Sequence, residues 1–321
     1  MINPDQLRVF LTAVETLNFS RTGERLNMSQ PSVTQHIHLL EKHFNAALFN
    51  RTGRKLSLTK AGIALVPLAH QIISLLMRTD ELMESLQKEI SGQLLIGCST
   101  TPGKYILPIL LADFMQRYPN VQAACHIHAR HKALELLQQG EVHFALSSSI
   151  EELDSNIEFR KFISDPVVLI APLNHPWTKL GEIEPELLRS ERFIFREETS
   201  GTYQVIRKGL GQLGIHMADL RPILTVGNSE AITIAVQQGV GLGFVSQMVV
   251  SHMGEGKVVQ LRVRGLNPSQ DIYLCRHRLQ PFTSLQAAFW EFAFQPDTDA
   301  MQKLQVATQR NLITEKTVSS Q

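Results

Sequence analysis

The chain has 321 residues, of which 43% are hydrophobic and 19% charged, as expected for a globular protein of two or three domains. No uninterrupted apolar run reaches the roughly 18 residues of a membrane-spanning helix, and the first residues, MINPDQLRVF, do not resemble a signal peptide. The three cysteines, Cys98, Cys125 and Cys275, are too few and too scattered for a disulfide framework. These features predict a cytoplasmic protein without a membrane segment.

The charge is nearly balanced over the whole chain, at +1, but not along it. Residues 1–60 contain eight Lys or Arg and four Asp or Glu, which gives this segment a net charge of +4. The rest of the chain is therefore mildly acidic. A basic N-terminal segment on an acidic body predicts a polyanionic partner for the N-terminal segment alone.

The stretch NMSQPSVTQHIHLLEKHF (27–44) is predicted to form a helix with one apolar face. Ser29 suits the N-cap, which places Pro31 in the first turn, where a missing N–H costs nothing. The outward face carries small polar residues instead of the Glu and Lys typical of a solvated helix, and such residues can bond to base edges in a major groove. The predicted core face consists of Val33, Ile37, Leu40 and Phe44.

The flanking segments complete a recognisable DNA-binding pattern. Ser20 is predicted to cap a short helix through Leu26, followed by a turn of three to four residues, which is helix-turn-helix spacing. Residues 48–62, LFNRTGRKLSLTKAG, predict a β-hairpin wing with a basic tip, after which Thr59 caps a long helix. From spacing alone, an ordinary helical hairpin with a polar surface explains the pattern equally well.

The segment LRVFLTAVETLNFSRTGERLNMSQPSVTQHIHLLEKHFNAALFNRTGRKLSLTKAG resembles the winged helix-turn-helix of LysR-type transcriptional regulators. SQPSVTQHI, LF-x-R and LT-x-AG carry the resemblance. It differs at Thr22-Gly23, where the family commonly has two alanines, and at Gln35 and His38, where basic residues are common. The DNA-binding residues predicted here are Ser29, Gln30, Pro31, Ser32, Thr34, Gln35, His38, Arg51 and Arg54.

Residues 59–89 carry a long apolar stripe, which a single helix cannot bury by itself. One interpretation is that the helix packs on its own body. The family resemblance implies instead a linker helix that pairs in a dimer or tetramer, which would present two reading helices to a palindromic site. Pro67 predicts a kink or an interruption. The residues predicted to contribute to dimerisation are Ile72, Leu76 and Met83.

From Gly92 onward, strand and helix patterns alternate, which predicts an α/β layered fold. Strands are expected at 93–99, 121–129, 142–149, 165–173, 270–275 and within 192–246, and helices at 102–119, 131–140 and 284–294. This part resembles the two-lobed, periplasmic-binding-protein-like effector domain of LysR-type regulators. STTPGKYILP (99–108) is most like regulators of carbon-fixation or sulfur-assimilation genes. The lobes are expected to join near 161–165 and 266–268.

Several predicted strands of the body end in small hydroxyl or amide residues. Ligands of open α/β sheets bind at the carboxyl ends of strands, and helix N-termini there favour anions. Each residue alone is explained by N-capping, but together they predict a cleft for a small anion. Lys104, Arg196, Glu197 and Glu198 are expected to lie near this cleft. The effector-binding residues predicted are Ser99, Thr100, Thr101, Ser147, Ser148, Ser200, Gly201, Thr202 and Asn228.

Other candidate sites are less consistent with the sequence. CHIHARH (125–131) brings one cysteine and three histidines together, but no matching pair of ligands is visible elsewhere, so no metal is expected. GVGLGF (239–244) follows a predicted helix, whereas a dinucleotide-binding loop follows a strand. No catalytic motif occurs, so no enzyme activity and no cofactor are predicted.

The complete interpretation is an α/β protein with a winged helix-turn-helix (1–60), a linker and dimerisation helix (61–91), a two-lobed effector-binding domain of periplasmic-binding-protein type (92–295) and a C-terminal tail (296–321). Lobe I comprises about 92–162 and 267–295, and lobe II about 163–266. The tail is predicted to be a frayed helix followed by coil. The predicted function is a transcriptional regulator that binds promoter DNA and a small anionic effector as a homodimer or homotetramer. The alternative is a cytoplasmic small-molecule binding protein of the same body fold without a DNA role.

Overall fold

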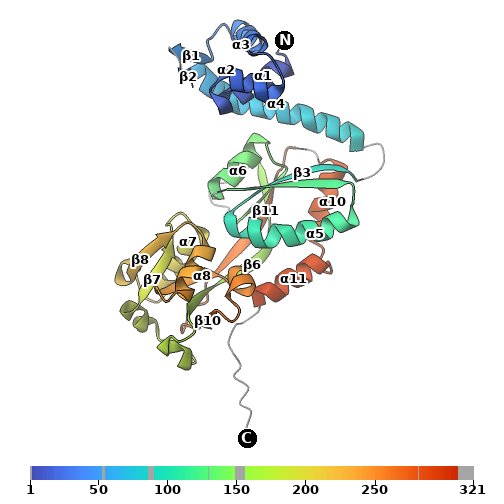
Figure 1. Ribbon diagram of the computed structural model, residues 1–321. Coiled ribbons are helices and arrows are strands. Elements are labelled where there is room, and N and C mark those ends of the chain that lie inside the picture. The colour runs from blue at the N-terminus through green and yellow to red at the C-terminus, as the bar shows by residue number, and fades with distance from the viewer. Residues whose placement is uncertain are drawn as a thin grey trace. The chain divides into compact units, whose positions relative to one another are not determined.

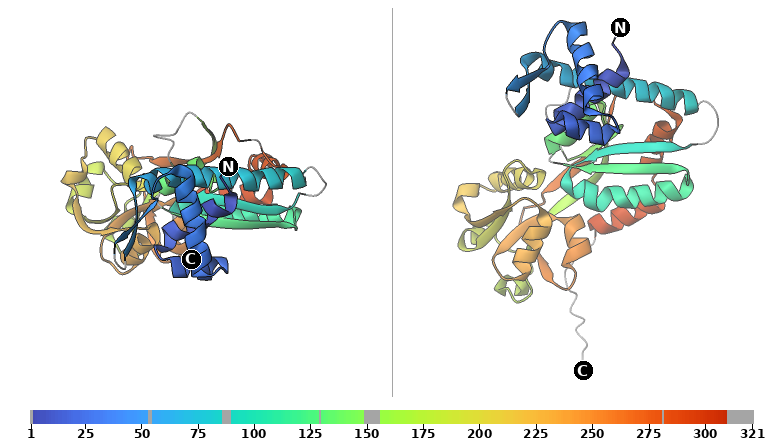
Figure 2. Two further views of the ribbon diagram at one scale, coloured as in Figure 1. Left: turned by 90° about the horizontal axis from the view of Figure 1, so that it is seen from above. Right: turned by 45° about the horizontal axis from the view of Figure 1, so that its top comes forward.

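The computed structural model describes residues 2–52, 55–85, 90–128, 130–148, 156–280 and 282–309. The chain folds into two compact units, one formed chiefly by Met1–Glu89 and the other chiefly by the residues from Ile90 onward. We call them the head and the body. Figure 1 shows both units, and Figure 2 gives two further views.

The head is a three-helix bundle followed by a two-stranded hairpin and a long helix (Figure 1). Leu7, Phe10, Val33, Ile37 and Leu40 are fully buried in its core, which confirms most of the apolar face predicted for the third helix. The hairpin pairs Phe49 with Leu58 in antiparallel register, as the predicted wing requires. The elements are α1 (Pro4–Thr16), α2 (Phe19–Leu26), α3 (Gln30–Phe44), β1 (Phe49–Thr52), β2 (Lys55–Leu58) and α4 (Lys60–Ser85).

Two details of the head correct the sequence prediction. Phe44 is not a core residue: its side chain is 37% exposed. It is the last residue of α3, after which Asn45 takes a left-handed conformation (φ +49°). The N-cap of α2 is Asn18 and not Ser20, because the Asn18 Oδ1 accepts hydrogen bonds from the backbone N–H groups of Ser20 and Arg21 at 2.9 and 3.2 Å.

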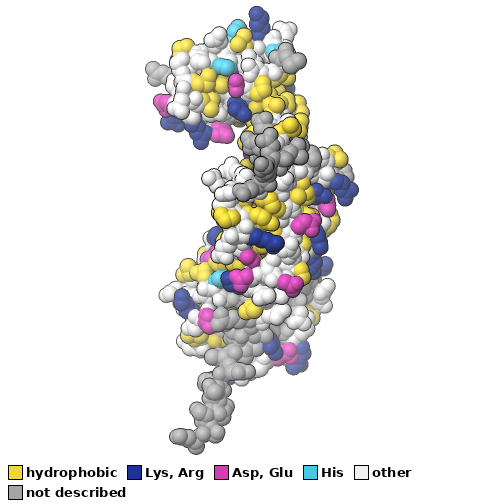
Figure 3. Space-filling model, turned by 90° about the vertical axis from the view of Figure 1, so that its right-hand side faces the viewer, with side chains coloured by type: hydrophobic (Ala, Val, Ile, Leu, Met, Phe, Trp, Pro, Cys, Tyr) yellow, Lys and Arg dark blue, Asp and Glu magenta, His cyan; other side chains and the backbone are white. Residues whose placement is uncertain are grey.

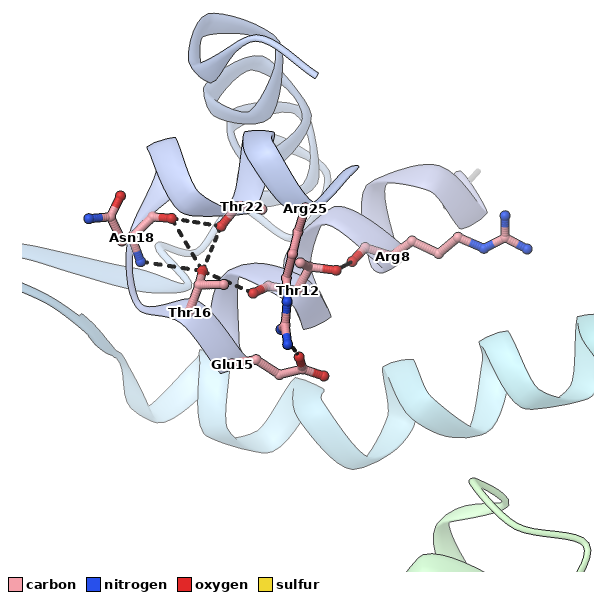
Figure 4. A network of polar contacts seen from close by, with 7 residues as sticks. All are labelled: Arg8, Thr12, Glu15, Thr16, Asn18, Thr22 and Arg25. Carbon is pink, nitrogen blue, oxygen red and sulfur yellow. Dashed lines mark hydrogen bonds and ion pairs between the residues drawn. The ribbon is translucent and has the colours of Figure 1, made fainter. Parts of the chain in front are cut away.

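Polar contacts between α1 and α2 accommodate Thr22, the first residue of the Thr22-Gly23 pair at which this head differs from the family (Figure 4). Thr22 is fully buried, and its hydroxyl lies 2.7 Å from the Thr16 hydroxyl and donates to the Asn18 carbonyl at 2.9 Å. An ion pair between Arg25 and Glu15 joins the same two helices. Buried polar groups are tolerated only when they are bonded in this way, so Thr22 is accommodated by its two partners.

Helix α4 is continuous through Pro67, so the proline interrupts nothing. Within the described residues, Lys60–Met77 is one helical segment long and apolar enough to cross a bilayer by length and composition. The sequence analysis considered uninterrupted apolar runs, and polar residues such as His70 and Gln71 break this run without lowering its average hydropathy far. A helix that pairs with another helix through an apolar stripe meets the same two criteria, so they do not establish a span.

The body is built on one mixed sheet of nine strands, ordered β4-β3-β5-β11-β6-β9-β7-β8, with β10 also paired to β6 (Figure 1, Figure 2). The predicted α/β architecture is confirmed. The strands are β3 (Gly92–Cys98), β4 (Val121–Ile127), β5 (Phe144–Ser147), β6 (Ile157–Pro172), β7 (Arg192–Arg196), β8 (Arg221–Val226), β9 (Leu242–Ser246), β10 (Val258–Leu261) and β11 (Ser269–His277).

Helices cover both faces of the half of the sheet formed by β6 to β10. Successive side chains of a strand point to opposite faces, so each strand contributes residues to two core clusters. Leu169, Phe193 and Phe244 pack in one core cluster with Ile206 and Leu210 of α7. Their immediate neighbours Ile170, Ile194 and Val245 pack in another with Ile232 and Val236 of α8. The α-helices of the body are α5 (Leu107–Arg117), α6 (Arg130–Gln139), α7 (Gly201–Gln212), α8 (Ser229–Gln237), α9 (Gln247–Val249), α10 (Ser284–Ala293) and α11 (Asp299–Gln309).

Strand β6 is longer than predicted and belongs to both lobes. Its first part pairs with β11, and its second part pairs with β9 and β10. The predicted helix 102–119 is also divided, into a π-helical turn and α5. The shorter helical turns are η1 (Pro102–Ile106), η2 (Pro176–Lys179), η3 (Pro185–Ser190), η4 (Met217–Asp219) and η5 (Val250–Gly254).

The segment after residue 295 contains more structure than a frayed helix. Ala300 and Leu304 of α11 are fully buried, and the backbone N–H of Ala300 donates to the Asp113 carboxylate of α5 at 2.8 Å. The weak apolar periodicity hid this packing, because only one narrow side of the helix contacts the body. Residues 310–321 lie outside the described residues.

Candidate functional sites

The outward face of α3 carries the residues that the sequence selects for base contacts. Ser29 caps the helix, since its hydroxyl accepts a hydrogen bond from the Ser32 backbone N–H at 3.3 Å. The Thr34 hydroxyl donates to the Gln30 carbonyl at 3.0 Å, which leaves its lone pairs free to accept from a base. Among the predicted residues Gln30, Pro31, Gln35 and His38 are exposed, and Ser32 and Thr34 are half-buried.

The basic tip of the wing lies only partly within the described residues. Arg51 lies on β1, but its side chain is not among those described, and Arg54 lies outside the described residues. The prediction that these two arginines contact DNA therefore remains a prediction.

The apolar stripe of α4 is largely uncovered within the head. The side chains of Ile72 and Leu76 are 36% and 37% exposed, and Met83 is 60% exposed. Large apolar side chains that remain uncovered along one helix commonly mark an interaction surface. In Figure 3, hydrophobic side chains are visible on the upper part of the molecule.

A small cleft of about 70 Å³ lies in the body between the ends of strands from both lobes. It contains seven of the nine predicted effector residues: Ser99, Thr100, Thr101, Ser148, Ser200, Gly201 and Thr202. The other two lie elsewhere. Ser147 is buried at the end of β5, and Asn228 is the N-cap of α8, whose Oδ1 accepts from the Ala231 N–H at 2.7 Å.

The hydroxyl groups of this cleft include one without a hydrogen-bond partner. Ser99 is 7% exposed, and its Oγ is buried and makes no hydrogen bond to any described residue. Thr101 and Thr202 are also buried, and Ser200 caps α7 by accepting from the Tyr203 N–H at 3.1 Å. A buried polar atom left unpaired carries a desolvation cost, so Ser99 is suited to bind an oxygen of a ligand.

Charged residues at the cleft are fewer than the sequence suggested. Arg196 and Glu197 line it and pair with each other. Lys104 is not among the lining residues, and its Nζ lies 2.9 Å from the Glu230 carboxylate. Glu198 is exposed and does not line the cleft.

Gln270 is a cleft residue that the sequence analysis missed. It is 4% exposed, and its Nε2 donates to the Asp165 carboxylate at 2.9 Å. This bond turns the amide oxygen of Gln270 away from Asp165, so the oxygen is an acceptor beside Gly201. No local signal could have identified Gln270, because β11 brings it to the cleft from more than 60 residues along the chain.

The residues of CHIHARH do not form a metal site within the described part of the chain, where no three His, Cys, Asp or Glu are grouped suitably. The rings of His126 and His128 stack with centroids 6.3 Å apart. Cys125 lies with its sulfur 3.7 Å from that of Cys98 on the neighbouring strand.

Comparison with known families assigns both units. Residues 4–63 match the bacterial regulatory helix-turn-helix protein, lysR family, and residues 87–295 match the LysR substrate binding domain. The chain belongs to the LysR family of transcriptional regulators. LysR-type proteins are DNA-binding regulators with an effector-binding domain, and the helix-turn-helix and two-lobed body described above are those two parts.

Relatives of this LysR-type regulator cover most of its length. It is 31% identical over 286 residues to an uncharacterized HTH-type transcriptional regulator of Methanocaldococcus jannaschii, with 89% of this chain and 96% of the relative covered. It is 34% identical to a probable RuBisCO transcriptional regulator of Cyanidium caldarium, with 75% and 77% covered. The body is similar to the CcmR regulatory domain of Synechocystis PCC6803 in complex with 2-PG (25% identity, TM-score 0.57, 63% and 96% covered).

Proposed function

We propose that this LysR-type regulator binds promoter DNA as a homo-oligomer in the cytoplasm and responds to a small anionic effector held in the body cleft. The observation that carries the proposal is the buried, unpartnered hydroxyl of Ser99 at a cleft lined by further hydroxyl groups.

The DNA part of the proposal is supported by the chemistry of α3. Gln30 and Gln35 offer paired donor and acceptor groups that match adenine, and the ring of Pro31 suits contact with a thymine methyl. The basic charge of residues 1–60 adds attraction to phosphates. Replacing Gln30 or Thr34 by Ala should weaken specific binding by roughly 1–3 kcal/mol per lost contact without disturbing the core.

The effector part is supported by the types of donor at the cleft. Hydroxyl groups and the free N–H groups at the start of α7 bind anions without bringing a fixed counter-charge. A cleft of about 70 Å³ suits a small molecule only. The likeness to a CcmR domain solved with 2-PG and to probable RuBisCO regulators supports a small metabolite as the effector.

The oligomer part is supported by the exposed stripe of α4. A second copy of the same helix would cover Ile72 and Leu76 and would place two heads on one DNA site. Pairing would remove these apolar side chains from water, which would stabilise the dimer relative to the monomer.

The test is a thermal-shift screen of small anions, followed by a gel shift on DNA upstream of the gene with and without any stabilising anion. Thr101→Val and Thr202→Val keep the side-chain shape and remove one hydroxyl each, so both should weaken effector binding and leave basal DNA affinity intact. Thr225→Val, on the exposed edge strand β8, is the matched control. Wild-type effector sensitivity in both cleft variants would show that these two hydroxyls do not contact the effector.

The same gel shift separates this function from the alternative of a binding protein without a DNA role. Loss of sequence-specific binding in Gln30→Ala, with an unchanged effector-induced thermal shift, is expected for a regulator. A wild-type chain that binds an effector and no DNA above non-specific background would favour the alternative.

A further inference from the structure

Arg196 and Glu197 form an unusual pair at the wall of the effector cleft. The Arg196 Nε and Nη2 donate to the two carboxylate oxygens of Glu197, at 2.9 and 2.7 Å. Both residues line the cleft, Arg196 at the end of β7 and Glu197 in the loop before α7. The bond is therefore bidentate and lies at the site where an effector is expected.

The two partners differ greatly in exposure. The Arg196 side chain is 8% exposed, whereas the Glu197 side chain is 41% exposed. A buried guanidinium needs a counter-charge, because removal of its partner leaves an uncompensated charge away from water. The Glu197 carboxylate has no such constraint, since it can turn into solvent and be hydrated there.

The pair also has no competing carboxylate among the described residues. Glu197 is the acidic side chain that bonds Arg196, and the neighbouring Glu198 is exposed and does not line the cleft. The other polar side chains that line the cleft are neutral hydroxyls, the Gln270 amide and His131. An incoming anion therefore finds the positive charge of the cleft already neutralised by one carboxylate.

We infer that Glu197 is an internal substitute for the anionic group of the effector, and that effector binding exchanges the Glu197 carboxylate on Arg196 for the carboxylate or phosphate of the ligand. This inference rests on the proposed effector function of the cleft. In the empty cleft Glu197 keeps Arg196 satisfied and in place. When the ligand arrives, Glu197 moves toward solvent and the guanidinium keeps a bidentate partner throughout.

The exchange determines which ligands the cleft accepts. A ligand must provide two oxygens that match one edge of the guanidinium, as a carboxylate or a phosphate does, because a spherical ion such as chloride gives up one of the two bonds made by Glu197. A neutral ligand cannot replace the carboxylate at all. Glu197 thereby lowers affinity for every anion and rejects those that bind Arg196 less well than it does.

The test compares Glu197→Gln with Glu198→Gln in the full-length protein. The two variants lose the same charge one residue apart, but of the two glutamates it is Glu197 that bonds Arg196. The probe is inorganic phosphate, titrated at constant ionic strength against potassium chloride, and the readout is the thermal unfolding midpoint followed by tryptophan fluorescence. Trp177 and Trp290, the two tryptophans of the chain, both lie in the body.

Glu197→Gln should bind phosphate on the order of tenfold more tightly than the wild type, the size of one charge-assisted hydrogen bond. Glu198→Gln should match the wild type. If Glu197→Gln bound phosphate no more tightly than the wild type, the inference would be overturned, and Glu197 would only position Arg196. The absence of phosphate binding in every variant would overturn it as well.

The Thr101→Val and Thr202→Val variants keep this result separate from the proposed function. Weaker phosphate binding in these two with no gain in Glu197→Gln would leave the effector cleft in place and reject the exchange. A gain in Glu197→Gln that is equally large in Glu198→Gln would also reject it, because general charge and not the pair would then be responsible.

Discussion

The Nζ of Lys104 lies 2.9 Å from Oε1 of Glu230, and this contact joins the two lobes of the body. Lys104 belongs to η1, which follows the first cleft strand, and Glu230 lies in the first turn of α8. The Tyr105 hydroxyl also donates to Glu230, at 3.1 Å. Two donors from one lobe thus hold one carboxylate of the other.

Removal of this contact should loosen the lobes. Burial alone would raise the pKa of Glu230, but the hydrogen bonds and charge of Lys104 outweigh it and lower the pKa below its usual value. The contact should therefore stabilise the body at neutral pH and fade as pH falls through the Glu230 pKa. Because Lys104 is 39% exposed, Lys104→Met should cost less than about 1 kcal/mol. A double-mutant cycle with Glu230→Gln, measured by urea unfolding, checks it; a coupling energy of zero at pH 7 would contradict it.

Asp165 should make the body less stable as pH rises through mildly acidic values. Burial raises the pKa of this fully buried carboxyl to about 6, although Ser246, Gln270 and Met248 donate to it. The folded state therefore holds this proton more tightly than the unfolded chain does, so stability falls as pH rises from about 4 to about 6. The loss is on the order of 3 kcal/mol for a shift of this size.

Asp165→Asn removes the ionisation and keeps an oxygen that can accept from Gln270. The difference in unfolding free energy between wild type and variant, followed by tryptophan fluorescence at several pH values, should change in favour of the variant between pH 4 and 7. A difference that stays constant over this range would show that Asp165 does not titrate there.

Gly23→Ala should destabilise the head. A Cβ at Gly23 would lie 2.5 Å from the backbone oxygen of Met28, a contact that only a shift of the turn between α2 and α3 can relieve. Overpacking of this kind costs typically 1–3 kcal/mol. Gly211→Ala in the exposed part of α7, where nothing lies within 4 Å, should instead stabilise by about 0.4–1 kcal/mol. Far-UV circular dichroism during thermal unfolding measures both, and equal effects of the two substitutions would show that the Met28 contact is relieved without cost.

Charged replacements on the stripe of α4 should prevent pairing of two chains. Ile72→Asp and Leu76→Asp place a charge on the uncovered apolar side, whereas Gln71→Asp places it on a residue that is already polar and exposed. Analytical ultracentrifugation should show monomers for the first two and the wild-type state for the third. DNA affinity for a full palindrome should fall with the loss of one half-site. A wild-type protein that is monomeric at micromolar concentration and binds DNA fully would reject the dimer.

Local sequence signals were enough to define the head and the order of elements in the body. Ser29, Pro31 and the spacing of Val33, Ile37 and Leu40 specify α3 through capping and helical periodicity, which act within a few residues. The hydroxyl residues at strand ends predicted seven cleft positions, because the carboxyl ends of parallel strands meet at one edge of a sheet. These are short-range rules, so they can be applied without a structure.

Tertiary packing decided what the local patterns left open. Gln270 reaches the cleft because β11 returns from the far end of the chain, and Asp165 orients its amide across paired strands. Arg196 is buried and the adjacent Glu197 is not, because Arg196 is the last residue of β7, which lies inside the sheet. Phe44 lies outside the predicted core because α3 ends there. Helix α11 packs on the body, where its Ala300 and Leu304 are buried and Asp113 of α5 accepts from the Ala300 N–H. Periodicity specifies which face of an element is apolar, but only the arrangement of the other elements determines whether that face, or a polar group beside it, is covered.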